Sequence, residues 1–250
     1  MPEPSARLAA KNAWLRTCKL LFPFRPRRWL TLYFGQRMKR YDADPGVAEM
    51  RRIRPYYRGT RILTSAGIVL VLLAFVIPFC VVFVDWGTFV IILVAYALLF
   101  LFSSLAGMVV QSAMDAILAL QHERKLSFGA AVKAFGSVAA ANPDLALGYM
   151  SIKMAVDFSL STLALALFLP ALLGAMALMV YVTDAVQDGI DLGTGPYLGL
   201  GAVAALAALG FAAVLLITVP AAAFYGYYTE EIIRYVKEAY PEAAHAEKAG

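Results

Sequence analysis

The chain has 250 residues, of which 61% are hydrophobic and 16% are charged, and its formal net charge is +5. Soluble globular chains are about 45–50% apolar and about 25% charged, so a single soluble core could not hide this much apolar surface. Several uncharged stretches reach 22 residues or more, and about 20 apolar residues suffice to span a bilayer. The composition excludes an ordinary soluble domain and predicts an all-α, polytopic integral membrane helix bundle.

Positive charge is concentrated at the start of the chain. Residues 1–61 hold 15 of the 22 Lys and Arg residues but only 4 of the 17 acidic residues. This segment lacks the uninterrupted apolar stretch and the cleavage-like site of a signal peptide. In its first part, Leu8, Leu15, Cys18 and Phe22 fall on one stripe of an expected helix. We predict a basic segment of amphipathic helices on the cytoplasmic membrane surface.

Two prolines mark further helices in that segment. Pro26 is expected to open a second helix, and Asp44 to cap a third helix that has Pro45 at its first position. Aromatic residues lie among the basic ones, which favours anionic lipid headgroups or an acidic partner over nucleic acid. The basic residues assigned to the membrane surface are Arg25, Arg27, Arg28, Arg51, Arg52, Arg54, Arg58 and Arg61.

Four transmembrane helices are predicted, at about residues 62–84, 89–110, 158–182 and 197–219. The second helix is expected to continue out of the lipid to about residue 125. An amphipathic connection follows, with boundaries at Ser127 and at the Asn142–Pro143 pair.

The apolar stretch at residues 145–182 leaves two interpretations open. A straight helix of its 38 residues would reach about 57 Å, nearly twice the hydrocarbon core. Either the first dozen residues lie at the membrane interface, or Pro170 and Gly174 break the stretch into a re-entrant pair. The first choice is simpler and gives the span at 158–182. Pro220 is expected to close the fourth span, and a charged helix then emerges.

Loop charge predicts the orientation. The segment before the first span and the loop between the second and third spans carry Lys and Arg, whereas the two opposite loops carry only acidic residues. Both termini are therefore expected in the cytoplasm, at the plasma membrane. We divide the chain into a surface segment at residues 1–61, a transmembrane domain at 62–240 and a disordered tail at 241–250.

A polar cluster is the main candidate site. Lys153 and Asp157 share one helix face at the edge of the third span. There the lysine could extend to water and anchor the helix, whereas burial would mark a transport or binding site. The second span carries a polar stripe with Ser104, Gln111 and Asp115, and Asp115 could meet Lys153 across the bundle. An ordinary helix–helix contact is the alternative for this stripe.

Small and aromatic residues in and after the fourth span suggest packing roles. A seam of small residues favours close helix packing in the bundle or in an oligomer, and it consists of Gly201, Ala205, Ala208 and Ala212. Three tyrosines beyond the span predict an interfacial aromatic belt, namely Tyr225, Tyr227 and Tyr228.

Catalytic and metal-binding patterns are missing from the sequence. It contains no HExxH, GxSxG, P-loop or GxGxxG pattern, and neither of the two histidines lies in a predicted span. Cys18 and Cys80 are too differently placed to pair, and there is no CxxC. We expect no enzymatic activity, no cofactor and no metal site.

The stretch QSAMDAILALQHERKLSFGAAVKAFGSVAAANPDLALGYM joins a helix leaving the membrane, a short amphipathic helix, a polar break and another span. In this layout, residues 60–235 resemble prokaryotic multi-pass membrane proteins, among them the membrane region attached to some glycerophosphoryl diester phosphodiesterases. The resemblance implies an integral membrane bundle. It implies no activity and no active-site residue, because the catalytic barrel of those enzymes is not in this sequence.

Two functions remain open. The first is a non-enzymatic scaffold, anchor or accessory subunit that uses residues 1–61 and the small-residue seam to hold a membrane partner. The second is a small oligomeric transporter or channel in which the polar cluster forms a cytoplasm-facing site.

Overall fold

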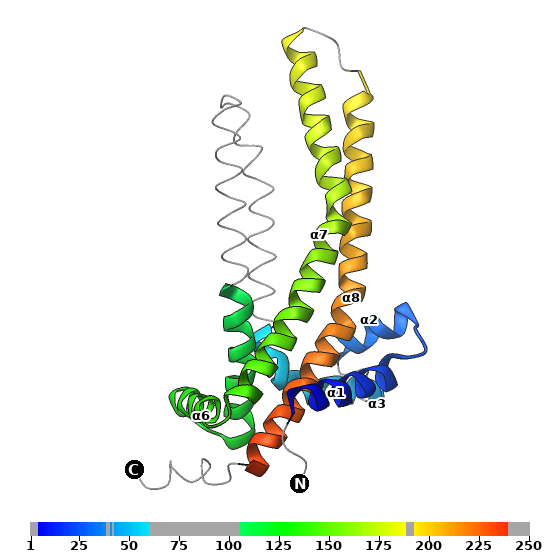
Figure 1. The fold of residues 1–250 in the computed structure, drawn as a ribbon. Helices are drawn as coiled ribbons and strands as arrows, with labels where there is room; N and C mark the ends of the chain where they lie inside the picture. The colour runs from blue at the N-terminus through cyan, green and yellow to red at the C-terminus, as the bar shows by residue number, and fades with distance from the viewer. Residues whose placement is uncertain (1–4, 39–40, 42, 61–105, 189–192, 240–250) are drawn as a thin grey trace.

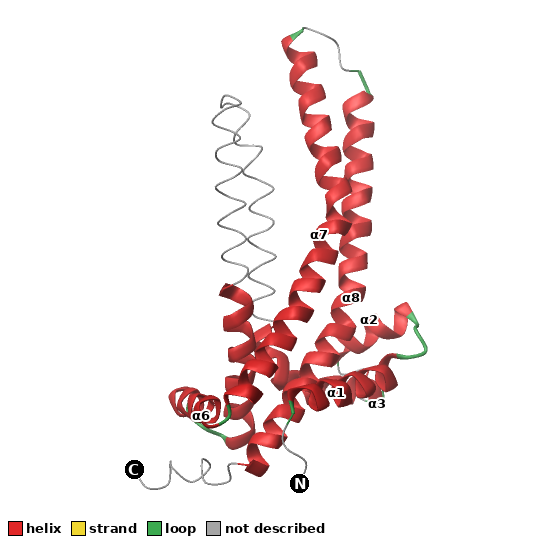
Figure 2. Ribbon diagram, viewed as in Figure 1, coloured by secondary structure: helices red, strands yellow, loops and turns green. Residues whose placement is uncertain are grey.

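A computed structural model describes residues 5–38, 41, 43–60, 106–188 and 193–239. These residues form helices, turns and short loops, without any strand (Figure 2). The predicted all-α class is therefore confirmed for the described part of the chain. The first predicted span, most of the second, Arg61, Cys80, Ser104 and the predicted tail lie outside the described residues.

The N-terminal segment folds into short helices whose boundaries follow local capping rules. They are α1 (Ala6–Leu21), α2 (Pro26–Phe34), η1 (Gly35–Arg37), α3 (Pro45–Ile53) and η3 (Arg54–Tyr57). Pro26 opens α2 as predicted. The Asp44 side chain caps α3 as predicted, since it accepts hydrogen bonds from the backbone N–H groups of Gly46 and Val47 at 2.8 and 3.2 Å.

The predicted boundaries in the middle of the chain are also confirmed. A helix covers residues 106–124, and α6 (Phe128–Ala141) follows with Ser127 as its cap. Asn142 ends α6, and its side chain accepts a hydrogen bond of 3.0 Å from the backbone N–H of Leu145, at the start of the next helix.

Two long helices complete the described chain. Helices α7 (Pro143–Gln187) and α8 (Gly195–Ala239) have 45 residues each and pack along one another (Figure 1). Both continue through an internal proline, Pro170 in α7 and Pro220 in α8. The re-entrant interpretation is therefore wrong, and Pro220 does not close a helix. A proline removes one backbone hydrogen bond, which neighbouring helices can compensate.

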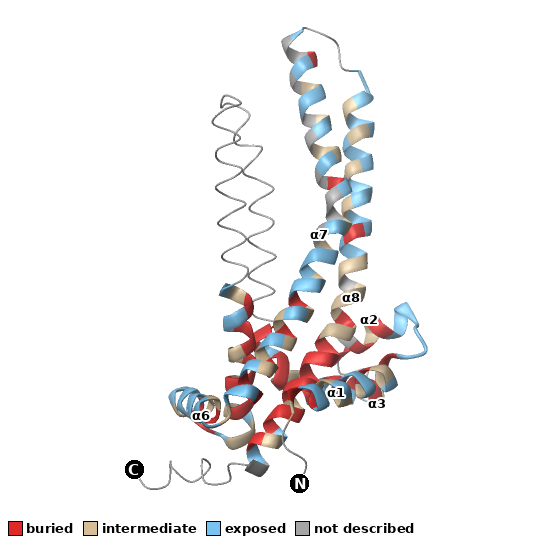
Figure 3. Ribbon diagram, viewed as in Figure 1, coloured by how far each residue is buried: buried red, intermediate tan, exposed pale blue. Residues whose placement is uncertain are grey.

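The molecule divides into a base and a projecting hairpin. The base contains α1, α2, α3, η3, residues 106–124, α6, the start of α7 and the end of α8, and most of the buried side chains lie there (Figure 3). The hairpin is the remaining part of α7 and α8. It exposes large apolar side chains, with Leu173 56%, Leu198 74% and Leu209 68% exposed. Such a surface is typical of contact with lipid and not with water.

Helix α8 carries the clearest membrane signal. Among the described residues, one helix is long and apolar enough to cross a membrane, at Gly195–Lys237. Only 12% of its most apolar stretch is buried, whereas the core helix of a soluble protein would be mostly buried. The described chain is thus helical with one candidate membrane span.

The N-terminal segment shares one core with the helices that follow it. Helix α1 turns its small residues Ala6, Ala9 and Ala13 inward, and they belong to the same buried cluster as residues of α7 and α8. The stripe predicted on the other side of this helix stays at the surface, with Leu8 39% and Leu15 50% exposed. The described residues between 5 and 57 are thus an integral part of the base.

The small-residue seam of α8 does not form the α7–α8 contact. All four of its residues, Gly201, Ala205, Ala208 and Ala212, are exposed. Helix α7 instead approaches the opposite face of α8, where a Cβ added at Gly199 would lie 2.7 Å from Leu178 Cδ1. The choice of face follows from shape, because glycine lets the bulky side chains of α7 sit against the α8 backbone.

Candidate functional site: a buried polar cluster

An ion pair lies at the centre of the base. The ammonium of Lys153, on α7, bonds the carboxylate of Asp115 in helix 106–124, and both side chains are 0% exposed. Thr60 completes the pair, since its backbone N–H donates to Asp115 at 2.9 Å and its hydroxyl donates to the same carboxylate. Three segments distant in sequence are therefore joined by one buried, hydrogen-bonded charge pair.

Asp157 forms the second half of the cluster. Its carboxylate accepts hydrogen bonds from the Tyr225 hydroxyl of α8 and, at 3.3 Å, from the Gln111 side-chain amide. It is 8% exposed. The structure thus brings together four of the five predicted cluster residues, and the fifth, Ser104, lies outside the described residues.

The expected roles of Lys153 and Asp157 change in this arrangement. Both residues are buried and Lys153 is 0% exposed, so the prediction that Lys153 extends to water as an anchor is wrong. The base surrounds this part of α7, and Asp115 supplies the opposite charge that the buried ammonium needs. Each member of the predicted pair therefore binds another helix.

Burial and charge act in opposite directions on the two residues. Burial lowers the pKa of Lys153, but the Asp115 carboxylate, together with Tyr149 and Asp157, outweighs this effect and the net pKa is raised. For Asp157, burial raises the pKa to about 6 against the opposing effects of the Tyr225 hydrogen bond and the Lys153 charge. The raised pKa keeps Lys153 protonated, and Asp157 titrates in mildly acidic conditions.

Aromatic side chains enclose the lysine. Its ammonium lies 5.6 Å from the ring centre of Tyr149 and 5.0 Å from that of Tyr225, within the range of cation–π attraction. The Tyr149 hydroxyl also shares a 3.0 Å hydrogen bond with Thr229. Tyr149 precedes Lys153 by four residues, so helical spacing could have identified it as a neighbour, whereas no sequence signal indicated Thr60.

The predicted interfacial tyrosine belt is wrong. Tyr225 and Tyr227 are each 2% exposed and Tyr228 is 0% exposed. Tyr228 stacks on Phe224 with ring centres 5.5 Å apart. These rings face the base because the end of α8 is surrounded by other helices.

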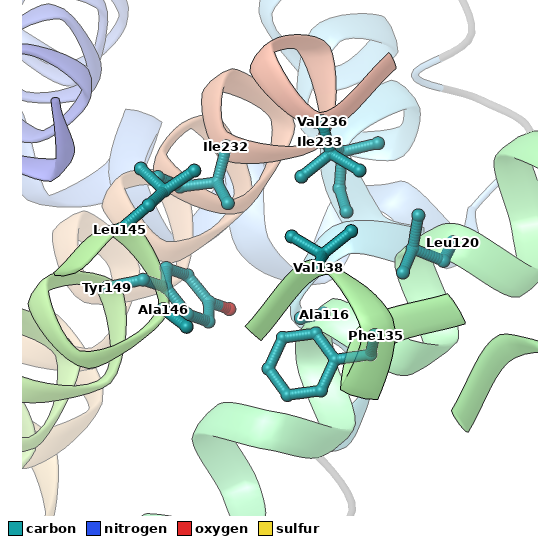
Figure 4. A pocket seen from close by; sticks show the side chains of 10 residues that line it. All are labelled: Ala116, Leu120, Phe135, Val138, Leu145, Ala146, Tyr149, Ile232, Ile233 and Val236. Atoms are coloured by element: carbon teal, nitrogen blue, oxygen red, sulfur yellow. The ribbon is translucent and has the colours of Figure 1, made fainter. Parts of the chain in front are cut away.

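An apolar cavity lies beside the cluster, between helix 106–124, α6, α7 and α8. Figure 4 shows its lining, which includes Leu120, Phe135, Val138, Tyr149 and Ile233. Its free volume is about 10 Å³, roughly the space of one water molecule. Small-molecule sites occupy about 300–1,000 Å³, so this cavity is a packing feature.

A second group of charges fastens the N-terminal helices to α8. Arg16 of α1 pairs with Glu230 and Glu231 at 3.1 and 3.2 Å. Arg52 of α3 pairs with Glu230 at 2.6 Å and with Glu49 at 2.9 Å. The hydrogen bond from Arg52 lowers the pKa of Glu49. Arg52, predicted for the membrane surface, is thus engaged within the protein.

The other basic residues predicted for the membrane surface divide into two groups. Arg51 donates a 3.2 Å hydrogen bond to the Gln36 carbonyl, and Arg54 is partly buried with an interaction of its own. The other four are exposed, and in the described part of the chain their guanidinium groups form no hydrogen bond or ion pair. They are Arg25, Arg27, Arg28 and Arg58.

The site is a buried cluster of charged and polar side chains joined by hydrogen bonds. No group of three His, Cys, Asp or Glu residues in the described ranges could hold a metal ion. No family model, curated protein or solved structure matches the chain. The function is therefore inferred from the geometry described above.

Proposed function

We propose that the chain crosses a membrane four times, at about residues 62–84, 89–110, 158–182 and 197–219, with both termini in the cytoplasm. The exposed apolar hairpin supports insertion. The first described helix and the end of α8 both belong to the base (Figure 1), which suits termini on one side. The Lys and Arg residues of the predicted inner segments favour the cytoplasmic side.

Within the membrane, the protein acts as a non-enzymatic scaffold, anchor or accessory subunit. One observation carries this proposal: apart from Leu21 at its end, α1 buries small residues and turns larger apolar side chains outward. Ala9 and Ala13 are 0% exposed, whereas Trp14 is 54% and Leu15 50% exposed. A helix that served only the base would bury its large side chains, so this outward face suits a protein partner.

The partner's chemistry follows from the residues around that surface. We define the outer face of α1 as Leu8, Lys11, Trp14, Leu15 and Lys19, all of which are exposed. No acidic residue occurs between residues 4 and 41. A matching partner surface has an apolar centre with an acidic rim.

The base presents this face in a fixed position. Arg16 ties α1 to α8 through Glu230 and Glu231, and its guanidinium lies 4.2 Å from the ring centre of Tyr227. A rigid surface loses little conformational entropy on binding, which favours its use as a docking site.

Site-specific photocrosslinking in native membranes tests the scaffold proposal. A crosslinking amino acid replaces Trp14 on the outer face of α1 or, as a control, the similarly exposed Val132 on α6. We expect one protein to crosslink at position 14 and not at position 132, and Trp14→Glu to abolish its co-purification. Deleting residues 1–45 is unsuitable, because Ala9, Ala13 and Leu32 are part of the core.

Two results count against a scaffold. One is equal crosslinking at both positions, and the other is undiminished co-purification of the partner with the Trp14→Glu variant. Membrane extraction and the thermal midpoint of each variant confirm that insertion and folding are intact.

A small oligomeric transporter or channel is the second candidate. Its support is the buried, ionisable cluster, because intramembrane and membrane-edge charges commonly serve ion or proton pathways. The test is flux in proteoliposomes with the double variant Asp115→Asn/Lys153→Met, which removes both charges of the ion pair together. Loss of flux in a stably folded double variant supports transport, and wild-type flux removes this alternative.

A further inference from the structure

The loop between α1 and α2, together with the first three residues of α2, forms an exposed stretch whose composition suits a lipid surface. Residues 22–28 read FPFRPRR, and all seven are exposed. Phe22 and Phe24 are 56% and 50% exposed, although aromatic side chains normally seek burial. We call these seven residues the aromatic–arginine tip.

The tip is held in a defined conformation by Trp29. The indole N–H of Trp29 donates a 2.8 Å hydrogen bond to the Leu21 carbonyl, which closes the loop from α1 to α2. Phe24 packs edge-on against the same ring with centres 4.5 Å apart, and Phe22 does so at 6.2 Å. The phenyl groups are thus supported from one side and open on the other.

The three arginines of the tip are available to an external anion. Within the described part of the chain, no acidic side chain pairs with Arg25, Arg27 or Arg28. This separates them from Arg16 and Arg52, whose guanidinium groups are engaged with glutamates. Guanidinium groups bind phosphate oxygens through paired N–H donors.

The position of the tip indicates which anion it meets. Helix α2 lies at the end of the base from which the hairpin projects, and the loop before it extends sideways from α8 (Figure 1). Beyond this level, the ribbons of α7 and α8 are mostly exposed or intermediate (Figure 3), and their exposed apolar side chains include Phe158 and Phe211. At a membrane–water boundary, phenyl rings can enter the headgroup layer while arginines remain with the phosphates.

We propose that the aromatic–arginine tip binds the headgroups of anionic phospholipids at the cytoplasmic membrane surface. The inference rests on the membrane insertion assumed in the proposed function, but not on the scaffold role. It narrows the surface charge predicted from the sequence to Arg25, Arg27 and Arg28 beside two phenylalanines, and excludes Arg52 of α3, which pairs with glutamates.

Fluorescence quenching in reconstituted full-length protein tests this inference. A cysteine-reactive fluorophore is attached to Phe22→Cys, and Cys18 and Cys80 are replaced by serine. Position 22 is chosen because Phe24 then stays against Trp29. The vesicles contain phosphatidylcholine with or without phosphatidylglycerol, and a fraction of the lipids carries a quencher near the headgroup. Asp144→Cys, at the opposite end of the base, is the control for water exposure.

A further label separates failure of this inference from failure of the proposed function. Leu209→Cys lies in the exposed hairpin and is quenched by lipids with an acyl-chain quencher if the hairpin is inserted. Absence of that quenching overturns membrane insertion itself. If the label at position 209 is quenched but the label at position 22 is quenched no more than the one at position 144, the tip inference alone is overturned.

The charge of the lipid gives the specific readout. We expect strong quenching at position 22 only when phosphatidylglycerol is present. Arg27→Gln should raise the mole fraction of phosphatidylglycerol that gives half-maximal quenching about fivefold, which is the effect of one cation at an anionic surface. Lys133→Gln, an exposed control on α6, should leave it unchanged. Equal quenching in neutral vesicles overturns anionic headgroup recognition.

A second measurement uses protein without any label. Native mass spectrometry counts the phosphatidylglycerol molecules retained by Arg27→Gln and by Lys133→Gln. Fewer retained lipids in Arg27→Gln supports the tip, and equal numbers in both variants contradict it.

Discussion

Removing one charge of the Lys153–Asp115 pair should cost far more stability than removing both. In Lys153→Met, the Asp115 carboxylate remains in a site that is 0% exposed. It keeps the backbone N–H of Thr60 at 2.9 Å and the Thr60 hydroxyl as donors, but no cation. Breaking a buried ion pair on one side typically costs about 3–5 kcal/mol.

The reverse substitution tests the same pair from the other side. Asp115→Asn leaves a buried ammonium whose nearest compensation is the 3.5 Å contact with the Thr60 hydroxyl and the rings of Tyr149 and Tyr225. In the double variant the charges disappear together, and the amide oxygen introduced at position 115 can still accept the Thr60 N–H. We therefore expect the double variant to lie within about 1 kcal/mol of the wild type, as apolar replacements of buried pairs often do.

Thermal unfolding of the full-length protein in a mild detergent measures this difference. For a chain of this size, about 1 kcal/mol corresponds to roughly 2–4 °C, so each single variant should melt about 10 °C lower. The double variant should recover most of that loss. Equal losses in the double and single variants would refute electrostatic pairing as the cause, and unchanged single variants would refute the burial of the pair.

Three further effects follow from the contacts in the base. Gly226→Ala should lower the free energy of unfolding by about 1–3 kcal/mol through overpacking, because the added Cβ would lie 2.9 Å from Ile53 Cβ. Gly201→Ala is the control and should not destabilise the protein, because a Cβ there meets nothing within 4 Å. Since the folded-state pKa of Asp157 is raised to about 6, its contribution to stability is present below the ordinary pKa and is lost as pH rises through 6; Asp157→Asn should remove that decrease from a melting series between pH 4 and 7. The lowered pKa of Glu49 has the opposite sign, so its contribution is present above its ordinary pKa and is lost on acidification; Glu49→Gln should flatten the fall of the thermal midpoint below pH 4.5, and an unchanged acid profile would contradict this.

The sequence alone determined the class of the fold and most local boundaries. Asp44 caps its helix as predicted, and Ser127 and Asn142 lie at the predicted boundaries, because helix ends depend on residues within one turn. The apolar length of residues 197–219 likewise identified the helix that the structure gives as a candidate span. Helical spacing in the sequence groups polar residues on one face, so the sequence also placed Gln111, Asp115, Lys153 and Asp157 in one candidate cluster.

Only the tertiary structure decided which partners these faces meet. Periodicity placed Leu8 and Leu15 on one side of α1, but the contact with α8 selected the alanine side for burial. Lys153 bonds Asp115 instead of its helical neighbour Asp157, and Tyr225 lies inside the base instead of at the membrane interface. Such choices depend on contacts between segments as far as 215 residues apart, whose packing energies no local pattern contains.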